Sequence, residues 1–203
     1  MNALIHAAID PQFPAEIKLV ISNRAGAAGL RIADESGVAT RVIAHEEYGD
    51  RESHEAAIQA ALEAAKIELV CLAGYMRLLT ADFVKRWQGR MINVHPALLP
   101  SFKGLDTHAR VLAAGCRVHG ATVHFVTADM DEGPIIVQAA VPVLESDTEE
   151  TLSERVLKVE HRLYPEALRR VAEGSVRMSG GIAVHTGTER TNPDFVLVSP
   201  DWD

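Results

Sequence analysis

The sequence predicts an α/β fold with a mostly parallel central sheet and helices on both of its faces. In the first half, short apolar runs alternate with helical patterns, which is typical of strand–helix–strand units. Apolar runs such as Leu69–Leu72 are continuous, as expected of strands buried on both faces. With 203 residues, 47% of them hydrophobic and 24% charged, the chain has the size and composition of about one globular domain.

The first half is predicted to alternate strands with helices joined by short connections. The strands are expected at Glu16–Ser22, Thr40–Ala44, Ile67–Ala73 and Met91–Val94. The helices are expected at Ala28–Gly37, Glu52–Lys66 and from Ala81 to Trp87. This order favours parallel pairing, because each helix returns the chain to the same end of the sheet.

The second half has a different pattern. Two strands, Ala121–Val126 and Pro134–Val143, are separated only by a short acidic turn, which favours an antiparallel pair. A long helix is expected to begin near Thr148 and to run to about Ala172. Pro165 lies inside this helix, so we expect a break or kink near Tyr164.

We therefore predict one domain over residues 1–178, followed by a loop-rich tail over residues 179–203. Gly180, Gly181, Pro193 and Pro200 punctuate the tail, and Phe195–Val198 could form a short strand.

Charge and composition narrow the range of partners. Twenty basic residues against 28 acidic ones give a net charge of −8, which argues against nucleic acid as a partner. No apolar run approaches the ~20 residues of a membrane span, and residues 1–8 do not resemble a signal peptide. Cys71 and Cys116 are the only cysteines, which favours a reducing cytoplasm. Neither the oligomeric state nor an interface can be derived, so a monomer and a weak homodimer both stay open.

Asn93 and His95 are candidate catalytic residues, because they end a predicted strand. Residues two apart on a strand face the same side, and ligands of open α/β sheets bind beyond the carboxyl ends of strands. An amide donor and an imidazole could stabilise an oxyanion and supply a proton. The alternative is that both side chains only satisfy backbone groups of the following loop.

The acidic turn contains Asp129, Asp131 and Glu132, and a solvated turn is its simplest interpretation. If Asp131 reached His95, its negative charge would favour the protonated imidazole. No spacing of His, Cys or carboxylate residues is typical of a metal site, so no metal is expected.

The segment Met91–Pro100 (MINVHPALLP), followed by Gly104, Thr107 and His108, resembles the signature of folate-dependent formyltransferases. Further matching stretches follow in order along the chain. They are Ala73–Leu79 (AGYMRLL), His119–Val126 (HGATVHFV), Asp129–Gln138 (DMDEGPIIVQ) and Val159–Pro165 (VEHRLYP). Within the family, the motifs resemble the branch that acts on glycinamide ribonucleotide in purine biosynthesis, and the resemblance covers residues 1 to about 178.

The resemblance implies a Rossmann-like formyltransferase fold. It also implies transfer of the formyl group from 10-formyltetrahydrofolate, the co-substrate, to the amine of glycinamide ribonucleotide. By position, His95 matches the proton donor, Asn93 the residue that holds the formyl oxygen, and Asp131 the carboxylate that keeps the histidine protonated. The positions that match folate contacts are Arg51, Met76, Arg77, Leu78, Leu79 and Asn93. Glu160 matches a contact to the glycinamide end of the substrate.

One departure from the family concerns residues 1–8, which resemble the helix that follows a glycine-rich phosphate loop. The family's first strand and this loop have no counterpart in the sequence, so we expect the central sheet to lack a strand. We also expect that the natural polypeptide begins upstream of Met1, and that the chain as written would bind the ribose phosphate weakly.

Two other functions stay open. A 10-formyltetrahydrofolate hydrolase would use the same three catalytic residues and pass the formyl group to water. A folate-binding module that has lost activity is the non-enzymatic alternative. A methionyl-tRNA formyltransferase is disfavoured, because binding of tRNA calls for a basic surface.

Overall fold

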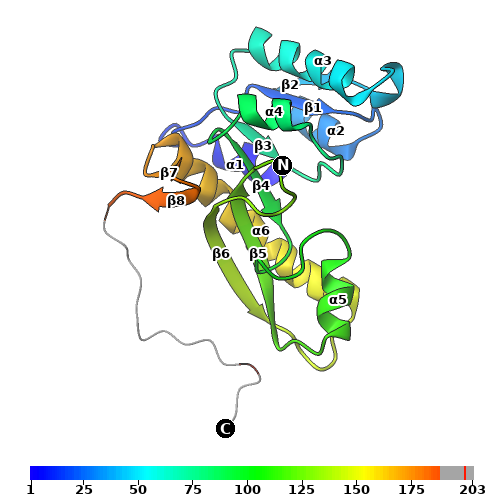
Figure 1. Ribbon diagram of the computed structural model, residues 1–203, viewed down its shortest axis with the longest axis vertical. Helices are drawn as coiled ribbons and strands as arrows, with labels where there is room; N and C mark the ends of the chain where they lie inside the picture. Colours follow the sequence, from blue (N-terminus) through cyan, green and yellow to red (C-terminus); the bar gives the residue numbers. More distant parts are fainter. Residues whose placement is uncertain (188–198, 200–203) are drawn as a thin grey trace.

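A computed structural model, which describes residues 1–187 and residue 199, has the α/β architecture that the sequence predicts (Figure 1). Its first part contains α1 (Asn2–Ala7), β1 (Leu19–Ser22), α2 (Ala28–Glu35), β2 (Ala39–Val42), a short 3-10 turn η1 (His45–Glu47), α3 (Arg51–Ala64), β3 (Val70–Leu72) and α4 (Ala81–Arg86). The second part contains β4 (Met91–His95), α5 (Thr107–Ala113), β5 (Val118–Phe125), β6 (Ile135–Pro142), α6 (Glu149–Ala172), β7 (Val176–Ser179) and β8 (Ile182–His185). The predicted strands and helices occur in the predicted order, with bounds that differ by a few residues, whereas η1, α5, β7 and β8 were not predicted.

The strands pair in parallel in the first half and antiparallel in the second. β1 pairs with β2 in parallel, and β3 pairs with β4 in parallel. A four-stranded sheet with the order β3-β4-β5-β6 continues from β4 through two antiparallel pairings. The predicted antiparallel pair is β5 and β6, and this prediction is confirmed.

Helices cover both faces of this four-stranded sheet, as neighbouring residues of β4 show. Ile92 packs into a core with α6, while Met91 packs into a second core with residues of α3 and α4. Figure 1 shows α6 running behind β5 and β6. Because odd positions of β4 share the Met91 side, Asn93 and His95 point to the α3 and α4 side of the sheet.

The central sheet is interrupted between β1 and β3. Within residues 1–187 these two strands belong to separate sheets, and a cavity of about 810 Å³ is lined by every residue of both. Apolar side chains from α1, α3, α4 and α6 also line the cavity, including Leu4, Leu62, Phe83 and Leu168. The interruption lies where the resemblance leads us to expect a missing strand, and nothing in the arrangement contradicts that expectation.

α6 begins and ends as predicted but does not break at Pro165. Thr148 and Thr151 form a reciprocal capping box at the N-terminus, and Gly174 adopts a φ of +73° just past the C-terminus. The helix is continuous through Pro165, so the predicted break is wrong. The buried side chains of Leu163, Tyr164, Ala167 and Leu168 anchor it on both sides of the proline, and the Tyr164 hydroxyl lies 2.8 Å from the carbonyl oxygen of Leu72.

Part of the predicted loop-rich tail is a β-hairpin. β7 and β8 pair antiparallel around Gly180 and Gly181, which both have positive φ. The tail therefore begins with a short β-ribbon at an earlier place than the one expected, because two adjacent glycines allow a tight reversal that lets the strands pair. The expected strand at Phe195–Val198 lies outside the described residues.

Across residues 1–187 and residue 199, every helix is too short or too polar to span a lipid bilayer.

A partly buried ion pair ties the start of α6 to the end of β6. Arg155 donates to both carboxylate oxygens of Asp147 over 2.6 and 2.8 Å, and also to the carbonyl of Pro142. Leu144 N–H and the Thr151 hydroxyl complete the contacts of the Asp147 carboxylate, whose side chain is 3% exposed. The hydrogen bonds from Arg155 hold the pKa of Asp147 well below its usual range.

We expect Asp147→Asn to lower the free energy of unfolding by roughly 1–3 kcal/mol at pH 7, because it leaves Arg155 without its bidentate partner. The folded-state pKa is lowered, so the charged form stabilises the fold above pH ~4 and this contribution declines as the pH falls further. Urea unfolding should therefore show a difference in the free energy of unfolding between wild type and variant that is smaller at pH 3 than at pH 7. Glu145→Gln, which alters an exposed ion pair with Arg117, is the control. If both variants lost the same free energy of unfolding at pH 7, the prediction would be contradicted.

Candidate active site

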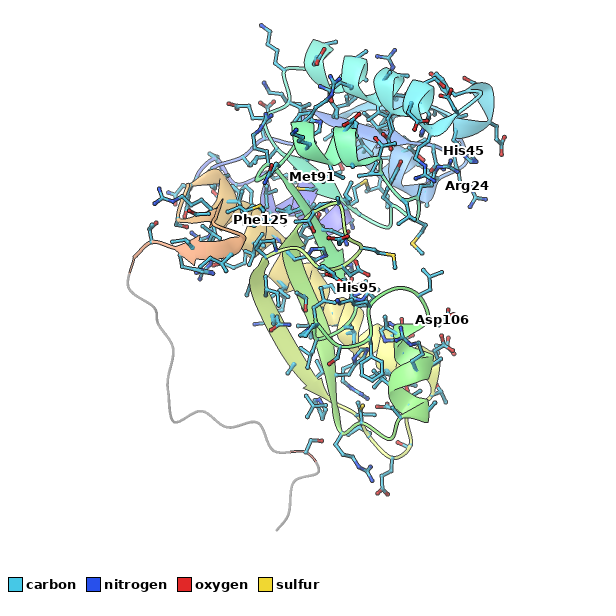
Figure 2. All side chains as sticks on the ribbon, in the orientation of Figure 1. Arg24, His45, Met91, His95, Asp106 and Phe125 are labelled. Carbon is cyan, nitrogen blue, oxygen red and sulfur yellow. The ribbon has the colours of Figure 1, made fainter. Side chains whose placement is uncertain are left out.

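β4 places Asn93 and His95 on one face of the sheet, next to β5. In the register of the pair, Asn93 lies opposite His124 and His95 lies opposite Thr122. Figure 2 labels Met91 and His95 at the two ends of β4. The two candidate residues thus leave the sheet at the carboxyl end of β4, as the sequence predicts.

His95 is buried, and both of its ring nitrogens face acceptors. Nε2 lies 3.0 Å from the carbonyl oxygen of Phe102, and Nδ1 lies 3.4 Å from Oδ2 of Asp131. His95 is 5% exposed, so little water competes for these positions. Only a ring protonated on both nitrogens would donate to both acceptors at once.

Asp131 reaches His95 from the turn between β5 and β6. Its Oδ2 also accepts a hydrogen bond of 2.9 Å from the backbone N–H of Gly104, and its side chain is 11% exposed. Asp131 adopts a φ of +55°, a conformation that aspartate tolerates better than most residues. The structure therefore brings Asn93, His95 and Asp131 to one place, and it links the turn to the loop after β4.

A polar network that the sequence analysis missed holds that loop. The Thr122 hydroxyl donates to the carbonyl of Ala97 over 2.7 Å and accepts from the N–H of Leu99. Gln138 Nε2 donates to the carbonyl of Leu99 and to the Thr122 oxygen, both over 2.9 Å. Thr122 is fully buried, so the network fixes the loop directly after His95. The only signal in the sequence was a polar residue within each of two apolar strands.

Three further histidines lie within electrostatic reach of His95, and no role in the site was predicted for them. His124 Nε2 lies 3.4 Å from Asn93 Nδ2. On the other side, His108 Nδ1 lies 3.1 Å from Nε2 of His119. Burial lowers the pKa of His119 to about 4, so this pair is neutral at pH 7.

The predicted folate-contacting segment leaves the sheet beside Asn93. β3 ends at Leu72, which lies opposite Asn93 in the parallel register, and residues 74–80 follow at the same edge of the sheet. Met76 and Leu78 are 74% and 58% exposed, while Arg77 and Leu79 are half-buried. Arg51 is exposed at the first position of α3. In the described part of the chain no hydrogen bond or ion pair joins these five residues to Asn93, His95 or Asp131.

Glu160 lies on α6, one turn before Tyr164. Tyr164 packs under the same edge of the sheet, where its hydroxyl lies within 3.0 Å of the carbonyl oxygens of Leu72 and Ile92. Burial raises the pKa of the Glu160 carboxyl above its usual value. The sequence-predicted substrate contact is thus a half-buried carboxyl, and within the described residues no hydrogen bond or ion pair joins it to Asn93, His95 or Asp131.

Among residues 1–187 and residue 199, no group of three or more His, Cys, Asp or Glu side chains is placed to hold a metal ion.

An amide that can donate to an oxyanion, an imidazole that can donate a proton and a carboxylate that accepts from the imidazole are the groups that an acyl-transferring enzyme needs. The chain belongs to the formyl transferase family, whose model matches residues 1–168.

Several known proteins are similar to this chain. The trifunctional purine biosynthetic protein adenosine-3 of Gallus gallus is 53% identical over 178 residues, which are 88% of this chain but only 18% of that protein. The phosphoribosylglycinamide formyltransferase of Escherichia coli is 37% identical, with 88% of this chain and 84% of that protein covered. The crystal structure of glycinamide ribonucleotide transformylase 1 from Symbiobacterium toebii superposes with a TM-score of 0.89 at 44% identity, covering 92% of this chain and 88% of that one. A formyltetrahydrofolate deformylase from Burkholderia mallei has a TM-score of 0.81 at 32% identity, covering 91% of this chain and 65% of that one.

Glu55 anchors the segment that follows β3. Its carboxylate is buried and accepts hydrogen bonds from both the backbone N–H and the hydroxyl of Thr80, which in turn caps α4 at Phe83 N. We expect Glu55→Gln to lower the free energy of unfolding by roughly 1–3 kcal/mol, because the amide cannot accept from both donors of Thr80.

Urea unfolding would measure this loss, and amide hydrogen exchange at Thr80 would show whether it is local. Glu52→Gln, an exposed position in the first turn of the same helix, is the matched control. Equal stability of the two variants would show that Glu55 does not anchor the segment.

Proposed function

We propose that this chain transfers the formyl group of 10-formyltetrahydrofolate to the amine of glycinamide ribonucleotide, a step of purine biosynthesis. The convergence of Asn93, His95 and Asp131 at the end of β4 is the observation that carries the proposal. Membership of the formyl transferase family supports it, as does similarity to formyltransferases along most of their length.

Asn93 stabilises the tetrahedral adduct in this proposal. Attack of the amine on the formyl carbon converts the formyl oxygen into an oxyanion. An N–H of the Asn93 amide would donate to this oxygen, and one such donor can lower the activation free energy by roughly 3 kcal/mol. The fixed position of Asn93 on a buried strand means that little reorganisation is needed during the reaction.

His95 supplies the proton that the departing folate nitrogen requires. The carboxylate of Asp131 lies 3.4 Å from Nδ1 and orients the imidazole, and the Phe102 carbonyl accepts from Nε2–H until that proton is needed. Gly104 N–H holds Asp131 in place, so the carboxylate can orient the imidazole throughout the reaction.

The remaining predicted residues would bind the two substrates. Met76, Arg77, Leu78 and Leu79 lie in the segment that starts beside Asn93, which supports a role in contacting folate. Arg51 would add a positive charge for the acidic end of the co-substrate. The Glu160 carboxyl would accept a hydrogen bond from the glycinamide end of the ribonucleotide.

The same proposal includes a cytoplasmic location, where purine precursors and folates are available. Cys71 and Cys116 are both free, which is consistent with a reducing compartment. Small molecules are the proposed partners, and the net charge of −8 disfavours nucleic acid. A monomer or a weak homodimer fits equally well.

Hydrolysis of 10-formyltetrahydrofolate is the second candidate, because a deformylase is among the similar structures. The lower identity to it, 32% against 44% for the transformylase, makes this candidate the weaker one. A binding module without activity is the third.

We expect turnover of 10-formyltetrahydrofolate, followed by folate absorbance, to require glycinamide ribonucleotide. The reason is the higher identity to the transformylase, 44% against 32% for the deformylase, since both reactions would use the same three residues. Turnover without the ribonucleotide would support a hydrolase instead. No turnover under either condition would support the binding module.

His95→Ala should reduce kcat about 100-fold or more, since it removes the proton donor, while folate affinity changes little. Asp131→Asn should also reduce kcat, because it removes the negative charge that faces the imidazole. His185→Ala, at an exposed histidine of β8, controls for loss of a histidine as such. Steady-state kinetics would measure all three variants, and near wild-type turnover of His95→Ala would remove His95 from the mechanism.

A further inference from the structure

His124 contacts the catalytic residues but has no part in the chemistry proposed above. It lies on β5 directly opposite Asn93, and it is 2% exposed. Its Nδ1 lies 2.9 Å from the carbonyl oxygen of Phe125. Since a carbonyl oxygen only accepts hydrogen bonds, Nδ1 must carry a proton.

The other ring nitrogen decides how Asn93 is oriented. Nε2 lies 3.4 Å from Nδ2 of Asn93 and 3.9 Å from Oδ1 of Asp131, and the second distance is too long for a hydrogen bond. Burial lowers the pKa of His124, so the ring is neutral and Nε2 has a free lone pair. An unprotonated Nε2 accepts from the amide nitrogen of Asn93 and would repel its amide oxygen.

The tautomer also affects Asp131. A proton on Nε2 would attract Oδ1 of Asp131 and compete with His95 for the carboxylate. With Nε2 unprotonated, the carboxylate keeps its contacts with His95 and with Gly104 N–H. The same ring state therefore favours both the amide orientation and the pairing of Asp131 with His95.

The backbone around Phe125 holds in place the carbonyl that accepts from His124 Nδ1. Phe125 N–H donates to the carbonyl of Pro134 over 2.9 Å, so the chain passes close to itself at this point. A Cβ at Gly133 would overlap the Phe125 carbonyl oxygen and lie 3.2 Å from His124 Nδ1. Glycine at position 133 thus leaves room for the acceptor that sets the tautomer.

We propose that His124 is a positioning residue: with its single proton on Nδ1, it accepts a hydrogen bond from Asn93 and leaves the second amide N–H of Asn93 free for the formyl oxygen. The inference rests on the proposed formyl transfer for its catalytic consequence. Its structural part, the tautomer, does not depend on any activity. In the opposite amide orientation, the oxygen of Asn93 would face the oxyanion and raise the barrier.

The first test is nuclear magnetic resonance of the full chain labelled with ¹⁵N-histidine, without substrates. The ring ¹⁵N signals that are present in the wild type and absent from the His124→Gln variant are assigned to His124. We expect a protonated Nδ1 and an unprotonated Nε2 between pH 7 and 8. A proton on Nε2, alone or together with one on Nδ1, would overturn the proposal whether or not the protein is active.

The second test uses kinetics with the two substrates. His124→Leu should lower kcat about 10- to 100-fold with little change in KM, because the amide of Asn93 loses its fixed orientation. His124→Gln, whose side-chain oxygen can stand in for Nε2 as an acceptor, should restore kcat to within about 5-fold of wild type.

A double-mutant cycle separates positioning from general damage to the fold. In an Asn93→Ala background, His124→Leu should lower kcat by less than about 3-fold, since the group it acts through is gone. An undiminished effect in that background would overturn the proposal. Absence of transfer by the unsubstituted protein would refute the proposed function instead, and the tautomer experiment would still decide the role of His124.

Discussion

The register of β4 against β5 is the constraint on which the candidate site depends. It sets Asn93 opposite His124 and His95 opposite Thr122, so each residue at the end of β4 has a buried polar neighbour on β5. A shift of one residue would turn Asn93 and His95 into the core that contains Ile92 and α6. The packing of both faces opposes such a shift, because it would also remove Ile92 and Met91 from the two separate cores into which they pack. Packing of the sheet therefore fixes the geometry of the polar groups.

The loop after β4 and the turn between β5 and β6 complete the site, and hydrogen bonds from a few polar side chains hold them in place. Thr122 and Gln138 hold the loop after His95, while the Asp131 carboxylate bonds to Gly104 N–H in that same loop. The loop and the turn therefore depend on each other. Replacing a group in either one alters the surroundings of His95 even when the imidazole itself is untouched, so the effects of such changes on activity are not expected to add.

Much of the fold could be predicted from the sequence, because its strands are short apolar runs and its helices have clear ends. The antiparallel β5–β6 pair and the capped α6 followed directly from the short turn and from Thr148 and Gly174. The continuity of α6 through Pro165 could not be predicted, since it depends on contacts of Tyr164 with carbonyls of β3 and β4. For the site, the spacing of Asn93 and His95 was sufficient to place them together. The roles of His124, Thr122 and Gln138 were not visible, because each depends on cross-strand register rather than on spacing along the chain.

The candidate catalytic residues, and His124 beside them, lie entirely in the continuous part of the sheet and its loops. Asn93, His95, His124 and Asp131 come from β4, β5 and the turn before β6, whereas the interruption and its cavity lie between β1 and β3. The orientation of the amide and the imidazole thus follows from hydrogen bonds within β4–β6 and their loops. Groups near the cavity, such as the segment that leaves β3, share an edge with Asn93 but are fixed separately, through Glu55 and Thr80. The groups that would act on the formyl carbon and those that would hold the folate are therefore positioned by different sets of contacts.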